Sequence, residues 1–414
     1  MNFTNPFLKI KRITSKKSSV SRIKSEKEIA KPKVAFLSKF ARVVISLGII
    51  AIVLCFIYLS IPNILAINSF EPKTFDKNTS ESTIRKVNIL LIVKDEVNGY
   101  EKLKTLDLVS YDESSKVINI KAINTKTIVG DSSLGKNVSI ENSYQLNLLK
   151  GGSDFDNLKF FENLLAVKLD YYLIVPMDYF KDSLKLMGGI LFANDYTSDK
   201  FPKGNVMLTG DNISTFWNST YANDGQSLVE QNKFLQTYFS KLGSFESFLN
   251  YSRLSEVSKM YLDTNMSLSF YTDLFRNAIF NANKINFGFS PTQLFLNTKD
   301  GKYWNIDKFD EYIKNEFSDT KIQREQARVE VQNASGTSGL ATKVARFVSN
   351  SGAEVSRVGN FGIEVPKTTV YVKDQNKFAE TVNFLENLLT NAEFRFESPE
   401  KLSTADILII VKEF

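Results

Sequence analysis

The apolar positions of this chain form one long continuous run, followed by shorter alternating and helical patterns. No charged residue occurs from Val43 to Phe70, and Val43 to Ile61 alone supplies about the 20 apolar residues that span a bilayer core. A cleaved signal peptide is the competing interpretation, but the roughly forty residues before the run are long for a charged signal region. We therefore predict an uncleaved transmembrane helix over residues 43–67, with its outer end marked by the helix-breaking Pro62.

Residues 68–84 are polar and lack an apolar period, which predicts a stalk. Beyond this segment, strand patterns and helix patterns alternate. The nearly continuous apolar run Val87–Val93 is typical of a buried strand. Two further strands are expected to form a hairpin with a polar turn at Asp112–Ser115, namely Leu106–Tyr111 and Lys116–Ile123. A helix, a strand and a helix follow, the last ended by Gly188-Gly189: Leu158–Val167, Asp170–Pro176 and Tyr179–Met187. This alternation predicts a mixed α/β sandwich over residues 85–320.

Three aromatic-rich helices are predicted in the second half of that domain: Leu228–Leu242, Ser244–Met260 and Tyr271–Ala282. Their aromatic residues recur mostly at helical spacing, which favours core packing, and the alternative is a pocket for a lipid or glycan. A polar stretch, Ser318–Ala327, then marks a domain boundary. Residues 328–414 show the order β-α-β-β-α-β, which predicts a smaller two-layer α+β domain.

The composition excludes several classes of chemistry. The chain has no histidine and one cysteine, Cys55, which excludes Ser-His-Asp and Cys-His nucleophile systems, nearly all catalytic zinc sites and an intrachain disulfide. No phosphate-binding loop, dinucleotide fingerprint or nucleic-acid module is present. We therefore expect no cofactor, no metal ligands of the protein's own and no nucleic-acid partner.

The positive charge of the chain is concentrated at its beginning. Residues 1–42 carry twelve Lys and Arg against two Glu, a net charge of +10, which leaves −4 for the rest of the +6 chain. By the positive-inside rule this basic tail stays in the cytoplasm and the bulk of the chain is extracytoplasmic, which predicts a single-pass protein of the cell membrane. The tail is interpreted as a topology determinant, with binding of nucleic acid or anionic lipid as the alternative.

The segment VEVQNASGTSGLATKVARFVSNSGAEVSRVGN, with the later TTVYV and TADILIIV, resembles the C-terminal domain of LytR-type cell-envelope proteins over residues 328–414. Its most specific part is the turn that contains Asn333, Ser335, Gly336 and Gly339. Gly336 and Gly339 precede a predicted helix, where backbone N–H groups can bind an anion. The simpler interpretation is that these glycines permit a tight strand-to-helix turn.

The middle of the chain resembles the extracytoplasmic domain of the LytR-CpsA-Psr family. The resemblance lies in VNILLIV, LDLVSYDESSKVINIKAINTKTIV, FFENLLAVKLDYYLIVPMDYFKDSLKLMGGI and LTGDNI followed by EQNKFLQTYFSKL. It implies the transfer of wall glycopolymers from a polyprenyl pyrophosphate carrier to peptidoglycan. It also implies peptidoglycan, wall glycopolymer or another envelope protein as partner.

The residues that carry charge in that family are replaced here. Where the family has an Arg and an Asp before its second strand, this chain has Lys102 and Lys104, and in place of Pro-Arg-Asp it has Asn124, Thr125 and Lys126. An Arg-x-Arg pair gives way to Asn218 and Thr220. Of an Arg-x-x-Arg-Gln motif only Gln231 remains, with Ser227 and Glu230 at the arginine positions. Independently of any alignment, no arginine occurs between Arg85 and Arg253.

These replacements weaken the expectation of catalysis. A pyrophosphate is best held by bidentate guanidinium groups, and magnesium requires carboxylate oxygens. Lysines can still hold a phosphate as point charges, and the candidates are Lys102, Lys104, Lys121 and Lys126. The acids considered as replacements for the lost carboxylates are Asp107, Asp112, Glu113 and Asp131, although Asp112-Glu113 is more simply a turn.

The sequence thus favours a membrane-anchored cell-envelope protein with a degenerate LytR-CpsA-Psr domain, in a binding or scaffold role without catalysis. The ligand would be wall polymer, a lipid-linked precursor or an envelope protein. The alternative is a divergent transferase that attaches glycopolymers to peptidoglycan with a lysine-based site. A regulatory sensor with a cytoplasmic basic tail is the third hypothesis.

Overall fold

The computed structural model describes residues 34–67, 70–74, 86–97, 99–131, 136–149, 154–290, 295–298, 301–399 and 403–414. The chain divides into two compact units, residues 1–57 and 58–414. Helix α1 (Val34–Ile67) contains a stretch, Leu47–Ala66, that is long and apolar enough to cross a membrane by length and composition. The prediction that the helix breaks at Pro62 is wrong, since α1 continues to Ile67.

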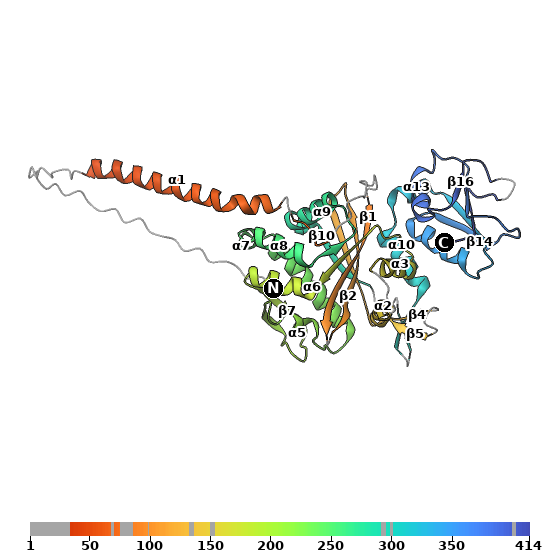
Figure 1. Ribbon diagram of the computed structural model, residues 1–414, viewed down its shortest axis with the longest axis horizontal. Coiled ribbons are helices and arrows are strands. Elements are labelled where there is room, and N and C mark those ends of the chain that lie inside the picture. Colours follow the sequence, from red (N-terminus) through yellow and green to blue (C-terminus); the bar gives the residue numbers. More distant parts are fainter. Residues whose placement is uncertain are drawn as a thin grey trace, which may run out of the picture. The chain divides into compact units, whose positions relative to one another are not determined.

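A six-stranded mixed sheet forms the centre of the second unit (Figure 1). Its strands, in spatial order, are β10 (Ile285–Phe289), β3 (Val117–Ile123), β2 (Tyr100–Asp112), β1 (Lys86–Val97), β6 (Tyr171–Pro176) and β9 (Asp263–Thr264). β2 pairs antiparallel with both β1 and β3, and β6 runs parallel to β1. The expected hairpin is confirmed, and its turn is closed by Asp112, whose carboxylate accepts hydrogen bonds from the backbone N–H groups of Ser114 and Ser115.

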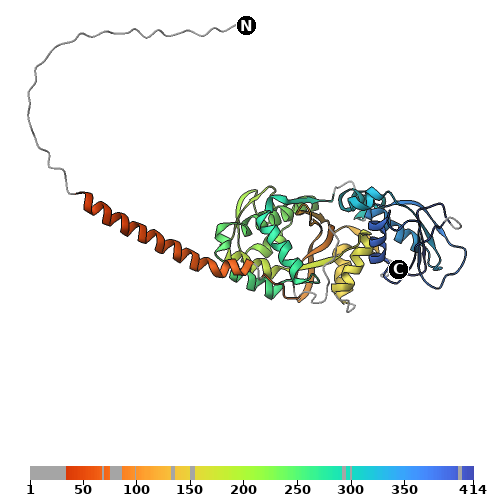
Figure 2. The same ribbon diagram turned by 90° about the horizontal axis from the view of Figure 1, so that it is seen from above.

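Helices cover both faces of this sheet, so the expected mixed α/β sandwich is confirmed. In Figure 2 the green helices and the yellow helices lie on opposite sides of the orange strands. One layer consists of α4 (Met177–Leu186), α6 (Asp224–Leu242), α8 (Tyr251–Tyr261) and α9 (Leu268–Phe280), and the other of α2 (Ile140–Leu149), α3 (Asp154–Leu165) and α10 (Ile306–Phe317). Because both faces are buried, β1 has the continuous apolar run seen in the sequence rather than an alternating pattern.

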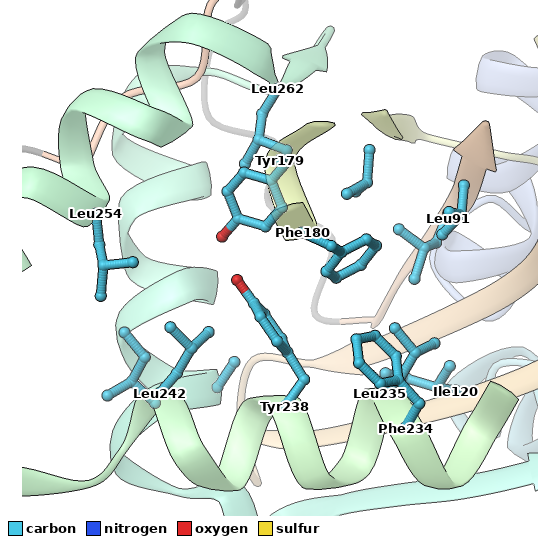
Figure 3. Packing of buried hydrophobic residues seen from close by; sticks show 14 of the residues in the cluster. Leu91, Ile120, Tyr179, Phe180, Phe234, Leu235, Tyr238, Leu242, Leu254 and Leu262 are labelled. Carbon is cyan, nitrogen blue, oxygen red and sulfur yellow. The ribbon is translucent and has the colours of Figure 1, made fainter. Parts of the chain in front are cut away.

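The larger core lies between the sheet and the first helix layer and is rich in aromatic residues (Figure 3). Phe180 packs edge-on against Phe234 and Tyr238, with ring centroids 5.3 and 5.1 Å apart. The Tyr238 hydroxyl donates a hydrogen bond to Ser183 Oγ at 2.9 Å, and burial raises the pKa of Tyr238 well above its ordinary value. The helical spacing of the aromatic residues therefore reflects core packing for most of them, as the sequence pattern favours, whereas Phe245 and Phe280 are exposed.

The predicted helix ends are only partly right. Helix α4 stops before Gly188 and Gly189, which have φ values of +72° and +81°, so the left-handed end is confirmed. The single helix expected over Ser244–Met260 is instead two helices, α7 (Phe245–Phe248) and α8, separated at Asn250.

Smaller elements connect these layers. The sequence patterns do not reveal the strands β4 (Ile128–Asp131), β5 (Lys136–Ser139), β11 (Phe295–Thr298) and β12 (Gly301–Trp304), which form one sheet, or β7 (Ile190–Asn194) and β8 (Gly204–Leu208), which form a hairpin. The short helix α5 (Ile213–Trp217) follows β8 and leads toward α6. Each of these elements is only four or five residues long, too short for a clear period.

The C-terminal domain has the predicted two-layer α+β fold. Its five strands, in spatial order, are β14 (Glu354–Asn360), β13 (Arg328–Asn333), β17 (Ile407–Val411), β15 (Thr369–Val372) and β16 (Glu393–Arg395). Helices α12 (Leu340–Ser351) and α13 (Ala379–Leu388) pack on one face of this sheet. The polar stretch expected as a domain boundary contains a helix, α11 (Thr320–Glu325), whose Ile322 is buried in the same core.

Helix α12 also joins the C-terminal domain to the α/β domain. Arg346 donates from Nε and Nη2 to the two carboxylate oxygens of Asp310 on α10, at 2.6 and 2.8 Å. One turn later, Asn350 Nδ2 donates to the carbonyl of Ala166 at 3.1 Å, and the backbone N–H of Asp319 donates to the carbonyl of Ser351. Bidentate and backbone contacts of this kind hold the two domains together as one compact unit.

Candidate functional site

A polar pocket of about 200 Å³ lies where the loop after β3, the first turn of α2, helix α5 and the first turns of α6 meet. It collects most of the positions at which this chain departs from the family pattern. Its lining includes Lys104, Asn124, Thr125, Lys126, Asn218, Thr220, Ser227 and Gln231, together with Glu141, Trp217, Asn223 and Asp224. Positions that are more than 100 residues apart in the sequence therefore face one common space.

Lys104 extends from β2 to the end of α5. Its Nζ donates to Asn218 Oδ1 at 2.5 Å, and Asn218 Nδ2 in turn donates to the carbonyl of Ser214 at 2.8 Å. Burial lowers the pKa of Lys104, while the nearby carboxylates of Asp95 and Glu141 act in the opposite direction. The ammonium group is thus held in a fixed position by a neutral amide.

Lys126 closes the opposite side of the pocket. The backbone N–H of Lys126 donates to Asn124 Oδ1, which fixes the loop after β3, and its Nζ lies 3.0 Å from Asp224 Oδ1. Asp224 opens α6 directly after Asn223, whose Oδ1 caps the helix by accepting from the backbone N–H of Gln226 at 3.0 Å. The Lys126 side chain is largely exposed, so this ion pair contributes little to stability.

The other lysines named from the sequence lie elsewhere. Lys121 Nζ pairs with Glu316 on α10 at 3.0 Å, which places it outside the pocket lining. Lys102 stands opposite Asp95 in the β1–β2 ladder and is also absent from the lining. Glu230 is fully buried and accepts from the backbone N–H groups of Asp195 and Tyr196, so it supports the segment after β7.

The carboxylates of the pocket are Glu141 and Asp224, which differ from the acids considered from the sequence. Asp107 is buried within the sheet, Asp112 closes the hairpin turn as expected, and the side chain of Asp131 lies outside the described residues. Burial raises the pKa of Asp107 to about 7.

A divalent cation does not fit this donor set. Asp224 faces the ammonium of Lys126, and Glu141 lies within electrostatic range of Lys104. The part of the chain that the structure describes also contains no group of three or more His, Cys, Asp or Glu residues able to hold a metal. Because magnesium is usually held by one or two carboxylates together with substrate phosphates, two lysine-neutralised acids are a poor seat for it.

An apolar cavity of about 90 Å³ lies next to the polar pocket, between the sheet and the first helix layer. Helix α6 lines both, because Leu228 and Gln231 face the polar pocket and Leu235 and Tyr238 face the apolar cavity one to two turns later. Trp217 of the pocket also stacks on Phe180 of the cavity wall, with ring centroids 6.2 Å apart. The two spaces therefore form neighbouring charged and apolar compartments.

The glycine-containing turn that carries the resemblance of the C-terminal domain lies between β13 and α12. Asn333 Oδ1 accepts from the backbone N–H of Ser335, and Asn333 Nδ2 donates to the carbonyl of Thr337. Gly336 and Gly339 have φ values of +73° and +83°, which side-chain-bearing residues rarely adopt. This geometry agrees with the interpretation as a tight strand-to-helix turn.

The fold and the paired compartments define a two-domain α/β protein with a small polar pocket beside an apolar cavity. The model of the LytR_cpsA_psr family matches residues 66–316, more than half of the chain, and the model for the LytR cell envelope-related transcriptional attenuator matches residues 326–413. The chain therefore belongs to the LytR-CpsA-Psr family of cell-envelope proteins, as the resemblance in the sequence indicates.

Similar proteins include polyisoprenyl-teichoic acid–peptidoglycan teichoic acid transferases named TagU. The Bacillus anthracis protein is 29% identical over 238 residues, which cover 53% of this chain and 75% of the relative. A Bacillus cereus protein is 30% identical over 216 residues, covering 49% and 68%. Among solved structures, Bacillus subtilis TagV is 21% identical with a TM-score of 0.45, over 56% of this chain and 98% of that one.

Sequence reasoning missed Glu141, Trp217 and Asp224 as pocket residues. A local signal was present for Asp224, because Asn223-Asp224 before an apolar helical period is a typical helix start with acid in the first turn. Glu141 carries no such functional signal. It reaches the pocket because its backbone N–H donates to the carbonyl of Thr125, which binds the start of α2 to the loop after β3.

Proposed function

We propose that this protein binds a lipid-linked precursor of a wall polymer at the outer face of the cell membrane and does not transfer the polymer. The proposal depends on one observation, namely that a lysine-bearing polar pocket and an apolar cavity share the wall formed by α6. A polyprenyl pyrophosphate carrier has the matching chemistry, a doubly charged headgroup joined to an apolar chain. The names of the TagU relatives describe a polyisoprenyl-linked polymer of this kind.

The apolar compartment supports binding of the carrier's chain. Its wall is formed by strand residues such as Leu91 and Val93 and by helix residues such as Leu235, Tyr238 and Phe275. At about 90 Å³ the cavity has room for about three water molecules, so a longer apolar chain enters when α6 and α9 move apart from the sheet. We therefore propose that carrier binding is coupled to opening of this helix layer.

The polar compartment supports binding rather than transfer. Lys104 and Lys126 offer two positive charges to a pyrophosphate, but an ammonium is a point charge and lacks the planar bidentate donors of a guanidinium group. Transfer of a phosphoryl-type group depends mostly on positioning and on stabilisation of developing charge. With no arginine between Arg85 and Arg253, those donors are missing from the pocket.

The proposed location of the protein is supported by its family and by one apolar helix. The family is one of cell-envelope proteins, and α1 contains one stretch that could span a membrane. We propose a single-pass anchor with the basic tail in the cytoplasm and both folded domains outside, so that the pocket faces wall polymers. Peptidoglycan, wall glycopolymer or another envelope protein would then be the partner of the bound complex.

A second function, transfer of the polymer to peptidoglycan, is favoured by one specific observation. Glu141 and Asp224 place two carboxylates in the same pocket as the lysines. In this function a bound pyrophosphate draws Lys126 away from Asp224, and one of the two carboxylates accepts the proton of an acceptor hydroxyl.

The deciding experiment uses the full chain reconstituted in lipid nanodiscs. It is titrated with polyprenyl pyrophosphate, with a lipid-linked wall polymer and with sonicated peptidoglycan, each with and without magnesium, and incubated to detect transfer. We expect saturable, magnesium-independent binding of the carrier and no polymer attached to peptidoglycan. Magnesium-dependent binding with transfer would establish the enzyme instead, and absence of carrier binding would contradict both functions and direct the search to a protein partner.

A further inference from the structure

The outer end of α1 has two different faces within the same two turns. Ser60, Asn63 and Ala66 recur at every third position and are buried. Asn63 Oδ1 accepts from the backbone N–H of Ser252 at 3.2 Å, which attaches this part of the helix to the start of α8. The opposite face consists of the exposed aliphatic residues Ile61, Ile64 and Leu65.

This arrangement constrains the position of the domain if α1 spans the bilayer. From Ser60 to Ala66 the helix rises by about 9 Å, so the buried and exposed faces lie at the same depth. The aliphatic face belongs to the stretch that is apolar enough to cross a membrane, and its side chains avoid water only within lipid. If α1 spans the bilayer, the contact between Asn63 and Ser252 therefore lies at the membrane surface.

Three further large apolar residues are exposed on the segment directly before α8 and at the end of α9. Phe245 begins helix α7 and Leu249 follows its end, with 60% and 45% of their surfaces exposed, and Phe280 at the end of α9 is 59% exposed. A Cβ on Gly243 would lie 2.8 Å from the carbonyl of Ile279, so the ends of α6 and α9 touch beside α7. We call Phe245, Leu249 and Phe280 the outer patch.

A continuous row of rings connects the outer patch to the core. Phe245 stacks on Phe248, Phe248 packs edge-on against Tyr251, and Tyr251 packs edge-on against Phe70, the third residue after α1. Phe70 stacks on Phe275, a wall residue of the apolar cavity, with ring centroids 4.4 Å apart. The chain that leaves α1 thus contacts the cavity wall directly, through the ring of Phe70.

We propose that the outer patch inserts into the outer leaflet of the membrane and holds the α6–α9 end of the apolar cavity against the lipid. Its occupant is the lipid surface itself, which accommodates phenylalanine and leucine side chains at the headgroup–acyl boundary. The inference rests on the membrane anchoring in the proposed function but not on binding of any carrier.

The test uses the full chain in vesicles with Cys55 replaced, Cys55→Ser, so that a single introduced cysteine carries an environment-sensitive fluorophore. The probe positions are Phe245→Cys and Leu249→Cys, and the control is Leu191→Cys on the β7–β8 hairpin, an apolar residue with a comparable exposure of 64%. Lipids that carry a nitroxide quencher near the headgroup are expected to quench the two probe positions at least threefold more than the control. Equal quenching at the three positions, or quenching only by aqueous iodide, would overturn the proposal.

Two further measurements separate this inference from the proposed function. Resistance of the full chain to carbonate extraction reports anchoring alone, and a chain that is extracted would overturn both. A pyrene label at Phe245→Cys reports self-association, and excimer emission without lipid quenching would make the patch a contact between copies and would overturn insertion. Because these side chains are exposed, the labelled variants are expected to keep the thermal unfolding midpoint of the unlabelled chain.

Discussion

The apolar cavity and the polar pocket lie along the same helix, yet they relate differently to the family to which the chain belongs. The cavity is lined by aliphatic and aromatic residues of a conventional core, whereas the pocket has lysines and amides at positions where the resemblance to the family implies arginines and acids. A core tolerates few changes without loss of stability, because its residues are packed on all sides. The rim of a pocket can change its charges at little cost to the fold, so the same framework can retain a ligand compartment and change its chemistry.

The largest effect is expected from removing an aromatic ring from the wall between the two compartments. Phe180→Ala removes a ring that is 3% exposed and contacts Trp217, Phe234 and Tyr238. We expect a loss of about 3–5 kcal/mol in the free energy of unfolding, measured by denaturant titration in detergent. The matched control, Phe245→Ala, removes an exposed ring and should change that free energy by less than about 0.5 kcal/mol. Similar losses for both variants would mean that α7 is part of the core.

A buried acid beside the apolar cavity makes the free energy of unfolding depend on pH. Asp107 lies opposite Leu91 in the β1–β2 ladder, beside the cavity wall, and burial raises its pKa from 3.8 to about 7. Between pH 4 and 7 the unfolded chain has lost this proton while the folded chain retains it, so stability falls as pH rises through that range. Three pKa units correspond to at most about 4 kcal/mol.

Asp107→Asn should remove this fall and leave a protein that is more stable than the parent at pH 7.5, measured as the free energy of unfolding from pH 4 to 8. The control is Asp112→Asn, because hydrogen bonds from Ser114 and Ser115 outweigh burial and lower the pKa of Asp112, so its contribution to stability is lost only as pH falls below about 4. If Asp107→Asn left the pH profile unchanged, the acid would have to be ionised within the fold.

Filling the cavity should separate binding of the carrier's apolar chain from binding of its pyrophosphate headgroup. Ala278 on α9 is buried and lines the cavity, and Ala278→Phe adds a ring to a space of about 90 Å³. We expect a cost of about 1–3 kcal/mol in stability from overpacking and, in nanodiscs, at least a tenfold loss of carrier affinity. Binding of soluble pyrophosphate to the lysine pocket should be unchanged, and a parallel loss of both would show that the compartments are not independent.

The same contrast explains what the sequence could predict. The strands β1, β2 and β3 and the end of α4 follow from local patterns, an apolar run, a polar turn and a glycine pair, so their prediction is confirmed. The division of α7 from α8 at Asn250 interrupts the apolar period too briefly to be seen. The pocket depends on contacts between distant segments, such as Glu141 with Thr125 and Lys126 with Asp224, and no local pattern encodes them. The sequence grouped Lys102, Lys104, Lys121 and Lys126 as candidates, and it gave no reason to set apart Lys102 and Lys121, which lie outside the pocket lining.

The smallest effect, and the one that most sharpens the proposed function, concerns the charges of the pocket. Lys104→Asp and Lys126→Asp each replace a positive charge by a negative one at the proposed pyrophosphate position, with Lys121→Asp as the control because that lysine pairs with Glu316 outside the lining. We expect each pocket variant to weaken carrier binding about tenfold, or about 1.4 kcal/mol, at low ionic strength, and the effect to shrink in high salt. The stability of the two pocket variants should change by less than about 1 kcal/mol, since their ammonium groups form one amide contact and one exposed ion pair.

Unchanged affinity in both pocket variants, with a loss in the control alone, would place the phosphate near α10 and would leave the polar pocket without a ligand. A gain of magnesium-dependent transfer in Lys104→Asp would show instead that the pocket needs a carboxylate at position 104 to catalyse transfer.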